Sequence, residues 1–181
     1  MTIYALSSGS GISGVAIIRI SGLEASNVIK SLTSREIPKP RMATLRKINN
    51  INTSELIDEG IIIWFPGPES YTGEDMAEIH IHGGKAGILA VQNEISKIKN
   101  CRLAEPGEFT KLAFQNGKIN LLKAESIGDL ISAETEIQRS QAIKIMKGKS
   151  SLKFNELREK LLKILSFIEA KIDFPEEDLP E

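Results

Sequence analysis

The sequence DMAEIHIHGG, residues 75–84, decides the fold class. Within residues 75–82, apolar and polar residues alternate from Ala77 to His82, and a period of two predicts a β-strand with one buried face. The apolar face carries Ala77, Ile79 and Ile81, and the polar face carries Glu78, His80 and His82. The glycine pair opens a predicted helix, because apolar residues then recur three and four positions apart, at Ile88, Val91, Ile95 and Ile98. The stretch therefore indicates a domain that mixes strands with helices.

Further strands and helices are predicted on both sides of this stretch. Short runs rich in Ile and Val, separated by Gly, Ser and Pro, predict strands at residues 3–6, 15–20, 42–48 and 59–65. Helices are expected from a capping box at Ser21–Glu24 through Leu32, and at residues 109–114, 121–146 and 152–172. Strands first and helices last indicate an α+β (α/β) domain with a mixed sheet, followed by a helical piece.

Composition excludes several classes of protein. The chain has 181 residues, 41% of them hydrophobic and 26% charged, which is the profile of a globular protein. A net charge of −1 gives no general attraction to nucleic acid or membrane, although residues 173–181 form an acidic tail on a mildly basic body. The single cysteine, Cys101, excludes an intrachain disulfide framework and favours a reducing compartment. No apolar run approaches the roughly 20 residues that span a bilayer, and the N-terminus lacks signal-peptide features.

Two phosphate-binding motifs are matched only superficially. Gly9–Gly14 fits GxGxxG, but a strand is predicted after it where a dinucleotide site needs a helix, so we expect a hairpin or loop. Gly148-Lys149-Ser150 resembles the end of a P-loop, but the glycine needed five positions earlier is Ile143. We therefore expect a turn between helices there, and no GTP or ATP site in this chain.

Glu78-x-His80-x-His82 leaves three interpretations open. Two imidazoles and a carboxylate on one strand face could begin a metal site, and so a metal-dependent hydrolase, but no second cluster of His or Cys exists in the sequence. The face could instead be a polar surface that hydrogen-bonds its neighbours. The interpretation we favour is an organic ligand held by Glu78.

Other residues are expected to be structural. Cys101 is predicted to be a buried thiol in a short strand, because no histidine lies near it in sequence to act as a base. The continuous apolar run 61–65 predicts a strand buried on both faces, with Trp64 in the core or an interface. Eight basic residues make the helical region locally basic; a solvated face is expected, with phosphate contact as the alternative. They are Arg139, Lys144, Lys147, Lys149, Lys153, Arg158, Lys160 and Lys163.

Six ordered sequence blocks together resemble a known family. They are GVAIIRISG (14–22), FPGPESYTGED (65–75), EIHIHGG (78–84), LAEPGEFT (103–110), AFQNGK (113–118) and AKIDFPEED (170–178). In this order and spacing they resemble the N-terminal part of the tRNA modification GTPases of the MnmE family, also called TrmE. The resemblance covers essentially the whole chain.

The resemblance implies a fold and a function. It implies a folate-binding and dimerisation domain at residues 1–118, similar to the folate-binding domain of aminomethyltransferases, and the first part of a helical domain at 119–181. The domain would bind a tetrahydrofolate derivative (5-formyl- or 5,10-methylene-tetrahydrofolate) that supplies a one-carbon unit. The family works with a flavoprotein partner that carries FAD and is called MnmG or GidA. Together they add an aminomethyl-type group, such as carboxymethylaminomethyl, to C5 of the wobble uridine U34 of tRNA.

Further expectations follow from the same resemblance. Family members are cytoplasmic homodimers, and their GTPase domain, which uses GTP, K⁺ and Mg²⁺, should begin soon after residues 174–178. Its P-loop is absent here, so this chain itself should not hydrolyse GTP. The apolar faces of the last helices should then lack their later partners, and we expect a dimer mate to cover them or part of them to stay exposed; they carry Leu157, Leu161, Ile164, Leu165 and Ile168.

The resemblance carries three folate-contacting residues onto this chain: Arg19, Glu78 and Lys118. A pterin presents N3–H and a 2-amino group side by side, so one carboxylate such as Glu78 can accept both hydrogen bonds. Arg19 and Lys118 suit the anionic or carbonyl parts of the ligand. Arg19 also lies in an otherwise apolar strand, where a charge should be paired or should face a ligand.

The sequence departs from the family pattern in three places. The glycine-rich loop of residues 7–13 lacks the usual prolines and arginine, Asn120 replaces an acidic residue, and Leu112 replaces a basic one. None of these is one of the three pocket residues. A ligand-free dimerisation module remains an alternative, as does the metal-dependent hydrolase.

Overall fold

The computed structural model describes residues 1–9 and 11–173, without the side chains of residues 149–151. The chain divides into two compact units, Met1–Ile119 and Asn120–Glu181, and each is described by itself below. The sequence block expected at residues 174–178 lies outside the described residues.

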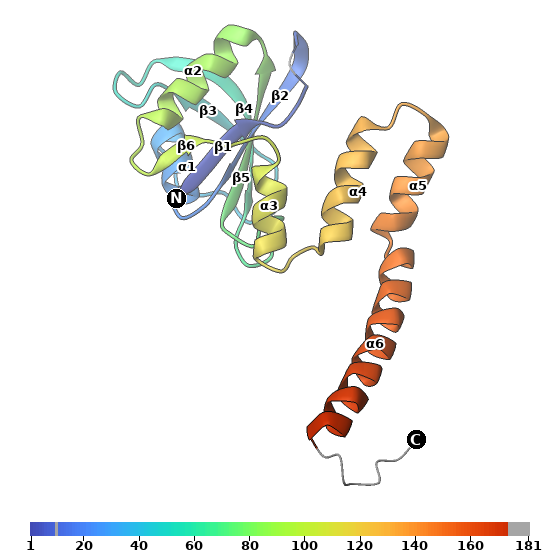
Figure 1. Cartoon of the computed structure of the whole chain (residues 1–181). Helices are drawn as coiled ribbons and strands as arrows, with labels where there is room; N and C mark the ends of the chain where they lie inside the picture. The colour runs from blue at the N-terminus through green and yellow to red at the C-terminus, as the bar shows by residue number, and fades with distance from the viewer. Residues whose placement is uncertain (10, 174–181) are drawn as a thin grey trace. The chain divides into compact units, whose positions relative to one another are not determined.

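Unit 1 is built on one mixed six-stranded sheet (Figure 1). The strands are β1 (Thr2–Leu6), β2 (Ser13–Ser21), β3 (Thr44–Asn49), β4 (Leu56–Phe65), β5 (Met76–Gly83) and β6 (Cys101–Leu103). They lie in the order β3-β4-β5-β2-β1-β6, and only the β1–β6 pair is parallel. The stretch that decided the fold class is therefore a central strand, β5, between β4 and β2.

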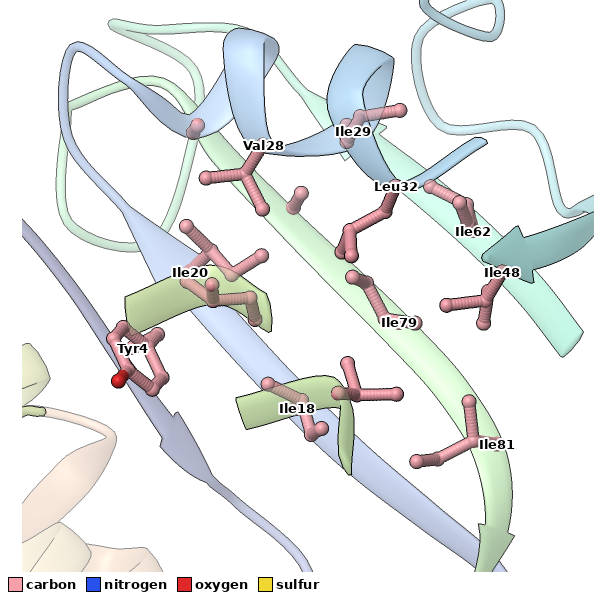
Figure 2. Packing of buried hydrophobic residues seen from close by; sticks show 14 of the residues in the cluster. Tyr4, Ile18, Ile20, Val28, Ile29, Leu32, Ile48, Ile62, Ile79 and Ile81 are labelled. Carbon is pink, nitrogen blue, oxygen red and sulfur yellow. The ribbon is translucent and has the colours of Figure 1, made fainter. Parts of the chain in front are cut away.

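Helices α1 (Ala25–Thr33) and α2 (Lys85–Ser96) pack on one face of this sheet. Figure 2 shows Val28, Ile29 and Leu32 of α1 facing strand residues such as Ile20 and Ile79. The predicted inward residues of β5 are buried, and so are Val91 and Ile95 of α2. The alternation and the helical spacing are both confirmed, because each pattern places its apolar side chains in the same core.

The opposite face of the sheet is only partly covered. Trp64 is buried as predicted, but Ile61 on the same strand is 39% exposed, so the predicted burial of this run on both faces is wrong. Leu45, the register partner of Ile61 on β3, is 62% exposed. The sheet therefore presents an open face that carries both apolar and polar side chains.

Cys101 is half-buried and packs against the core, and burial raises the pKa of its thiol.

The capping box expected at Ser21–Glu24 does not form. Ser21 belongs to β2, and its hydroxyl lies 2.7 Å from Thr72 Oγ1 and donates to Glu74 Oε2 at 2.9 Å. Helix α1 begins after Glu24, whose side chain caps nothing, although its backbone N–H donates to Thr2 Oγ1. The prediction was wrong because a tertiary partner, the loop around Thr72, binds the hydroxyl in place of a helix N–H.

Unit 2 contains three helices in its described residues: α4 (Leu121–Ser132), α5 (Glu136–Met146) and α6 (Lys149–Asp173). The single helix predicted over 121–146 is therefore wrong. It is interrupted after Ser132, because Thr135 and Gln138 form a capping box that starts α5. The turn predicted at Gly148 is confirmed, and Gly148 has the positive φ of 84° that favours glycine.

The long helix α6 keeps its apolar side chains exposed, as predicted. Leu157, Leu161, Ile164, Leu165 and Ile168 are each about half exposed. No helix in the described part of the chain is both long and apolar enough to cross a membrane.

Glu94 of α2 is a buried carboxylate that fixes the loop between β3 and β4. It accepts hydrogen bonds from Lys97 Nζ at 2.6 Å, Asn50 Nδ2 at 2.9 Å and the Ile51 N–H at 3.1 Å. The hydrogen bond from Lys97 lowers the pKa of Glu94 below its usual range. Burial acts in the opposite direction, and the hydrogen bond from the Ile51 N–H lowers the pKa further. The group should therefore stabilise the folded state only when it is ionised.

We expect Glu94→Gln to lower the free energy of unfolding by about 2 kcal/mol at pH 7, the scale of a lost hydrogen bond to a charged group. Because the folded pKa lies below the unfolded value of about 4.3, this contribution is complete above pH ~4.3 and disappears as the pH falls through the folded pKa. Urea titrations of both proteins at several pH values measure the difference. Glu55→Gln, which removes an exposed carboxylate from the same loop, is the control; a gap between wild type and Glu94→Gln that widens at low pH would contradict the assignment.

Candidate functional site

Arg19 and Glu78 form an ion pair across two central strands. They are direct register partners on β2 and β5, so their side chains leave the sheet side by side on its open face. Arg19 Nε and Nη2 both donate to Glu78 Oε1, at 3.1 and 2.9 Å. The side chains are 29% and 18% exposed, so the pair is screened from solvent but reachable. Both bonds end on one oxygen, which leaves the acceptor capacity of Oε2 largely for other partners.

Two aromatic rings flank the Arg19 guanidinium. The rings of Tyr71 and Phe109 each have their centroids 5.7 Å from Arg19 Cζ, which is cation–π range. Tyr71 lies in the loop between β4 and β5, and Phe109 lies on helix α3 (Glu108–Gln115). The Tyr71 hydroxyl lies 3.0 Å from Thr110 Oγ1, which ties the loop to the helix. The rings restrict where the guanidinium can point.

The same loop connects Lys118 to this pair. The Lys118 side chain packs at Gly73: a Cβ at Gly73 would lie 3.3 Å from Lys118 Cγ. Gly73 has a φ of 82°, a conformation that favours glycine, and a Cβ there would also crowd the Lys118 side chain. Asn116 Nδ2 donates to the Thr72 carbonyl at 2.7 Å and fixes the turn that carries Lys118. Arg19 and Glu78 are thus in direct contact, whereas Lys118 contacts the loop that carries Tyr71, at Gly73.

The two histidines on β5 have different partners. His80 Nε2 lies 3.4 Å from Glu78 Oε2, beside the Arg19–Glu78 pair. His82 is mostly exposed, and its Nδ1 lies 2.8 Å from Asp58 Oδ1. Burial opposes ionisation of Asp58, but hydrogen bonds from the His82 ring and backbone N–H lower its pKa below the usual range. Within the described residues, no three His, Cys, Asp or Glu side chains form a group that could hold a metal ion.

Sequence reasoning missed the aromatic and loop residues of this site. Tyr71, Thr72 and Phe109 all lie within the blocks SYTGED and GEFT, which carried the family resemblance. Their position against Arg19 has no sequence signal of its own, since β2, the loop and α3 are far apart along the chain. Only the fold brings them together.

Two family models match almost the whole chain. A model described as "GTP-binding protein TrmE N-terminus" matches residues 2–118, and one described as "MnmE helical domain" matches residues 121–181. The chain belongs to the TrmE/MnmE family. The boundary between the two matches lies beside the boundary between the two structural units.

Individual members of the TrmE/MnmE family match along the whole chain. A tRNA modification GTPase MnmE of Pelagibacter ubique is 79% identical over all 181 residues. One from Parvibaculum lavamentivorans is 44% identical over 99% of the chain. A zebrafish protein named 5-taurinomethyluridine-[tRNA] synthase subunit GTPB3, mitochondrial, is 47% identical over the same share. The chain spans 41%, 41% and 36% of these relatives' lengths.

Proposed function

We propose that unit 1 binds a reduced folate at Arg19, Glu78 and Lys118. The observation that carries the proposal is the Arg19–Glu78 pair, whose two hydrogen bonds both end on Oε1. A carboxylate held in this way is oriented by the arginine, and its Oε2, which has only the long 3.4 Å contact with His80 Nε2, keeps acceptor capacity on the open face of the sheet. The ligand would be a tetrahydrofolate derivative, either 5-formyl- or 5,10-methylene-tetrahydrofolate.

The residues present fit such a ligand. Glu78 can accept the two parallel N–H groups of a pterin edge, one at each oxygen, if Oε1 gives up one of its two arginine bonds and keeps the other. The rings of Tyr71 and Phe109 offer flat apolar surface beside the Arg19 guanidinium that Glu78 binds. Lys118 supplies a positive charge for a carbonyl or carboxylate further along the ligand. When bound, the folate supplies a one-carbon unit; the chain's own residues bind and orient it.

The wider role we propose is in tRNA modification. Relatives that are 44–79% identical are named tRNA modification GTPases, and the zebrafish relative is named for a modified uridine. The chain would then serve an enzyme that adds an aminomethyl-type group to wobble uridine with a flavoprotein partner of the MnmG/GidA type. GTP, K⁺ and Mg²⁺ would act in a GTPase domain, and FAD in the partner.

We also propose that unit 1 pairs with a second copy. Its open sheet face exposes Leu45 at 62%, Val15 at 54% and Ile61 at 39%. Apolar side chains gathered on one sheet face are typical of an interaction surface. A homodimer formed there would place the two Arg19–Glu78 pairs on the faces that approach each other.

A calorimetric titration of the 181-residue chain tests the folate proposal. We expect saturable binding of 5-formyl-tetrahydrofolate, and no comparable binding of p-aminobenzoylglutamate, which lacks the pterin. A matched titration with Zn²⁺ tests the metal-dependent hydrolase. No folate binding together with tight Zn²⁺ binding would favour the hydrolase; binding of neither would leave the ligand-free dimerisation module.

A further inference from the structure

Basic residues are concentrated in one segment of unit 1. Residues 30–47 contain six basic side chains and one acidic side chain. The other residues of unit 1 carry seven basic and eleven acidic side chains, so the segment is positive within an otherwise negative unit. A local excess of this size attracts anions, although the net charge of the whole chain is near zero.

The fold gathers four of these residues at one edge of the sheet. Lys30 is in the last turn of α1, and Arg35 follows that helix. Arg46 and Lys47 lie on β3, the edge strand. Two adjoining hollows share Ser34, Arg35 and Arg46 in their lining, and their volumes are ≈ 550 and ≈ 680 Å³. We call Lys30, Arg35, Arg46 and Lys47 the basic edge.

Three of the four basic-edge residues form no ion pair within the described residues, although Glu36 lines one hollow and Glu59, the register partner of Lys47, lines the other. Lys30 pairs with Glu36 at 2.8 Å, but neither Arg35 nor Lys47 has an ion-pair partner within the described part of the chain. Arg46 donates from Nη1 only to the neighbouring Leu45 carbonyl, at 3.2 Å, and its Nε is buried without a hydrogen-bond partner. An unpaired buried N–H costs free energy unless a ligand satisfies it.

We propose that the basic edge binds the phosphate backbone of RNA. The inference rests on the proposed role in tRNA modification, which favours RNA over an acidic protein. Arginine presents a planar fork of donors that fits phosphate oxygens, and Arg35 and Arg46 line the same two hollows. No aromatic residue lines either hollow, so stacking on bases is not supported. The contact should therefore follow the RNA backbone and not its sequence.

Structural roles explain part of this charge but not all of it. A lysine in the last turn of α1 complements the helix dipole, and charged residues on an edge strand oppose pairing with another strand. These roles account for Lys30 and Lys47. They do not account for the unpartnered Nε of Arg46 or for the two arginines that line both hollows.

The test measures binding of unfractionated tRNA by fluorescence anisotropy between 50 and 200 mM salt, with the 181-residue chain. The test variant is Arg35→Gln/Arg46→Gln/Lys47→Gln, and the matched control is Lys85→Gln/Lys99→Gln/Lys111→Gln, which removes the same charge elsewhere on unit 1. We expect the test variant to bind on the order of tenfold more weakly and its salt dependence to fall by about two to three in log–log slope. Arg35→Gln/Lys47→Gln repeats the test without altering the partly buried Arg46.

Several outcomes would overturn the proposal. Equal loss in the test and control variants would show a dependence on net charge alone. Absence of tRNA binding by the wild-type chain at 50 mM salt would also overturn the proposal. Displacement of tRNA by poly-glutamate at equal charge would identify an acidic polypeptide as the ligand. Self-association of the test variant with unchanged tRNA affinity would assign the charge to edge protection. The folate titration is independent of all these outcomes, so it shows separately whether the proposed function fails.

Discussion

Glu78→Gln is expected to weaken binding of 5-formyl-tetrahydrofolate by about 10- to 150-fold, the equivalent of ~1.5–3 kcal/mol for a hydrogen bond to a charged group. Glutamine keeps the shape of the side chain and one acceptor oxygen, so Arg19 can retain a partner. It replaces the second oxygen by an NH₂ group, which cannot accept from a pterin N–H. Calorimetric titration of both proteins under identical conditions measures the change.

His82→Gln is the matched control for this variant. It lies four residues further along the same face of β5, but its partner is Asp58 and not the Arg19–Glu78 pair. Folate affinity should stay within twofold of wild type. If His82→Gln and Glu78→Gln lose affinity equally, the carboxylate has no special role, and the face as a whole would have to be reconsidered as the site.

Ile79→Ala is expected to cost about 2–5 kcal/mol of folding free energy. Ile79 is fully buried on β5, the strand that lies between β2 and β4, and it faces the core in Figure 2. Removing three carbons there leaves a cavity that the rigid sheet cannot close. Because domains are stable by only ~5–15 kcal/mol, the variant should unfold at clearly lower urea concentration.

Fluorescence of Trp64 reports this transition, since it is the only tryptophan and it is buried in unit 1. Ile12→Ala is the control, because it makes the same change at a fully exposed side chain and should shift stability by less than ~0.5 kcal/mol. Equal urea midpoints for Ile79→Ala and wild type would mean that β5 is not the central strand of the core.

The local patterns of the sequence predicted the strands and helices of unit 1 well. The alternation in residues 75–82 predicted both the strand and which of its side chains lie on the buried face, because burial of one face leaves only one register. The same alternation placed Glu78 on the polar face, opposite the core. Arg19 was expected to be paired because an isolated charge in an apolar strand is costly, and it is paired with Glu78.

Interactions between distant segments could not be predicted in this way. The Ser21 hydroxyl matches a capping box, but Thr72 and Glu74, some fifty residues later, provide its partners. The rings that flank Arg19 come from a loop and a helix with no periodic signal. The break before α5 had a local signal, Thr135 with Gln138, which the strong apolar pattern of residues 121–146 obscured.

A crystal structure of the chain grown with 5-formyl-tetrahydrofolate would show whether the Arg19–Glu78 pair is the folate site. We expect the pterin edge on the Glu78 carboxylate, with Arg19 still bound to Oε1 and Lys118 facing the ligand. A ligand bound elsewhere on unit 1, with the Arg19–Glu78 pair untouched, would contradict it.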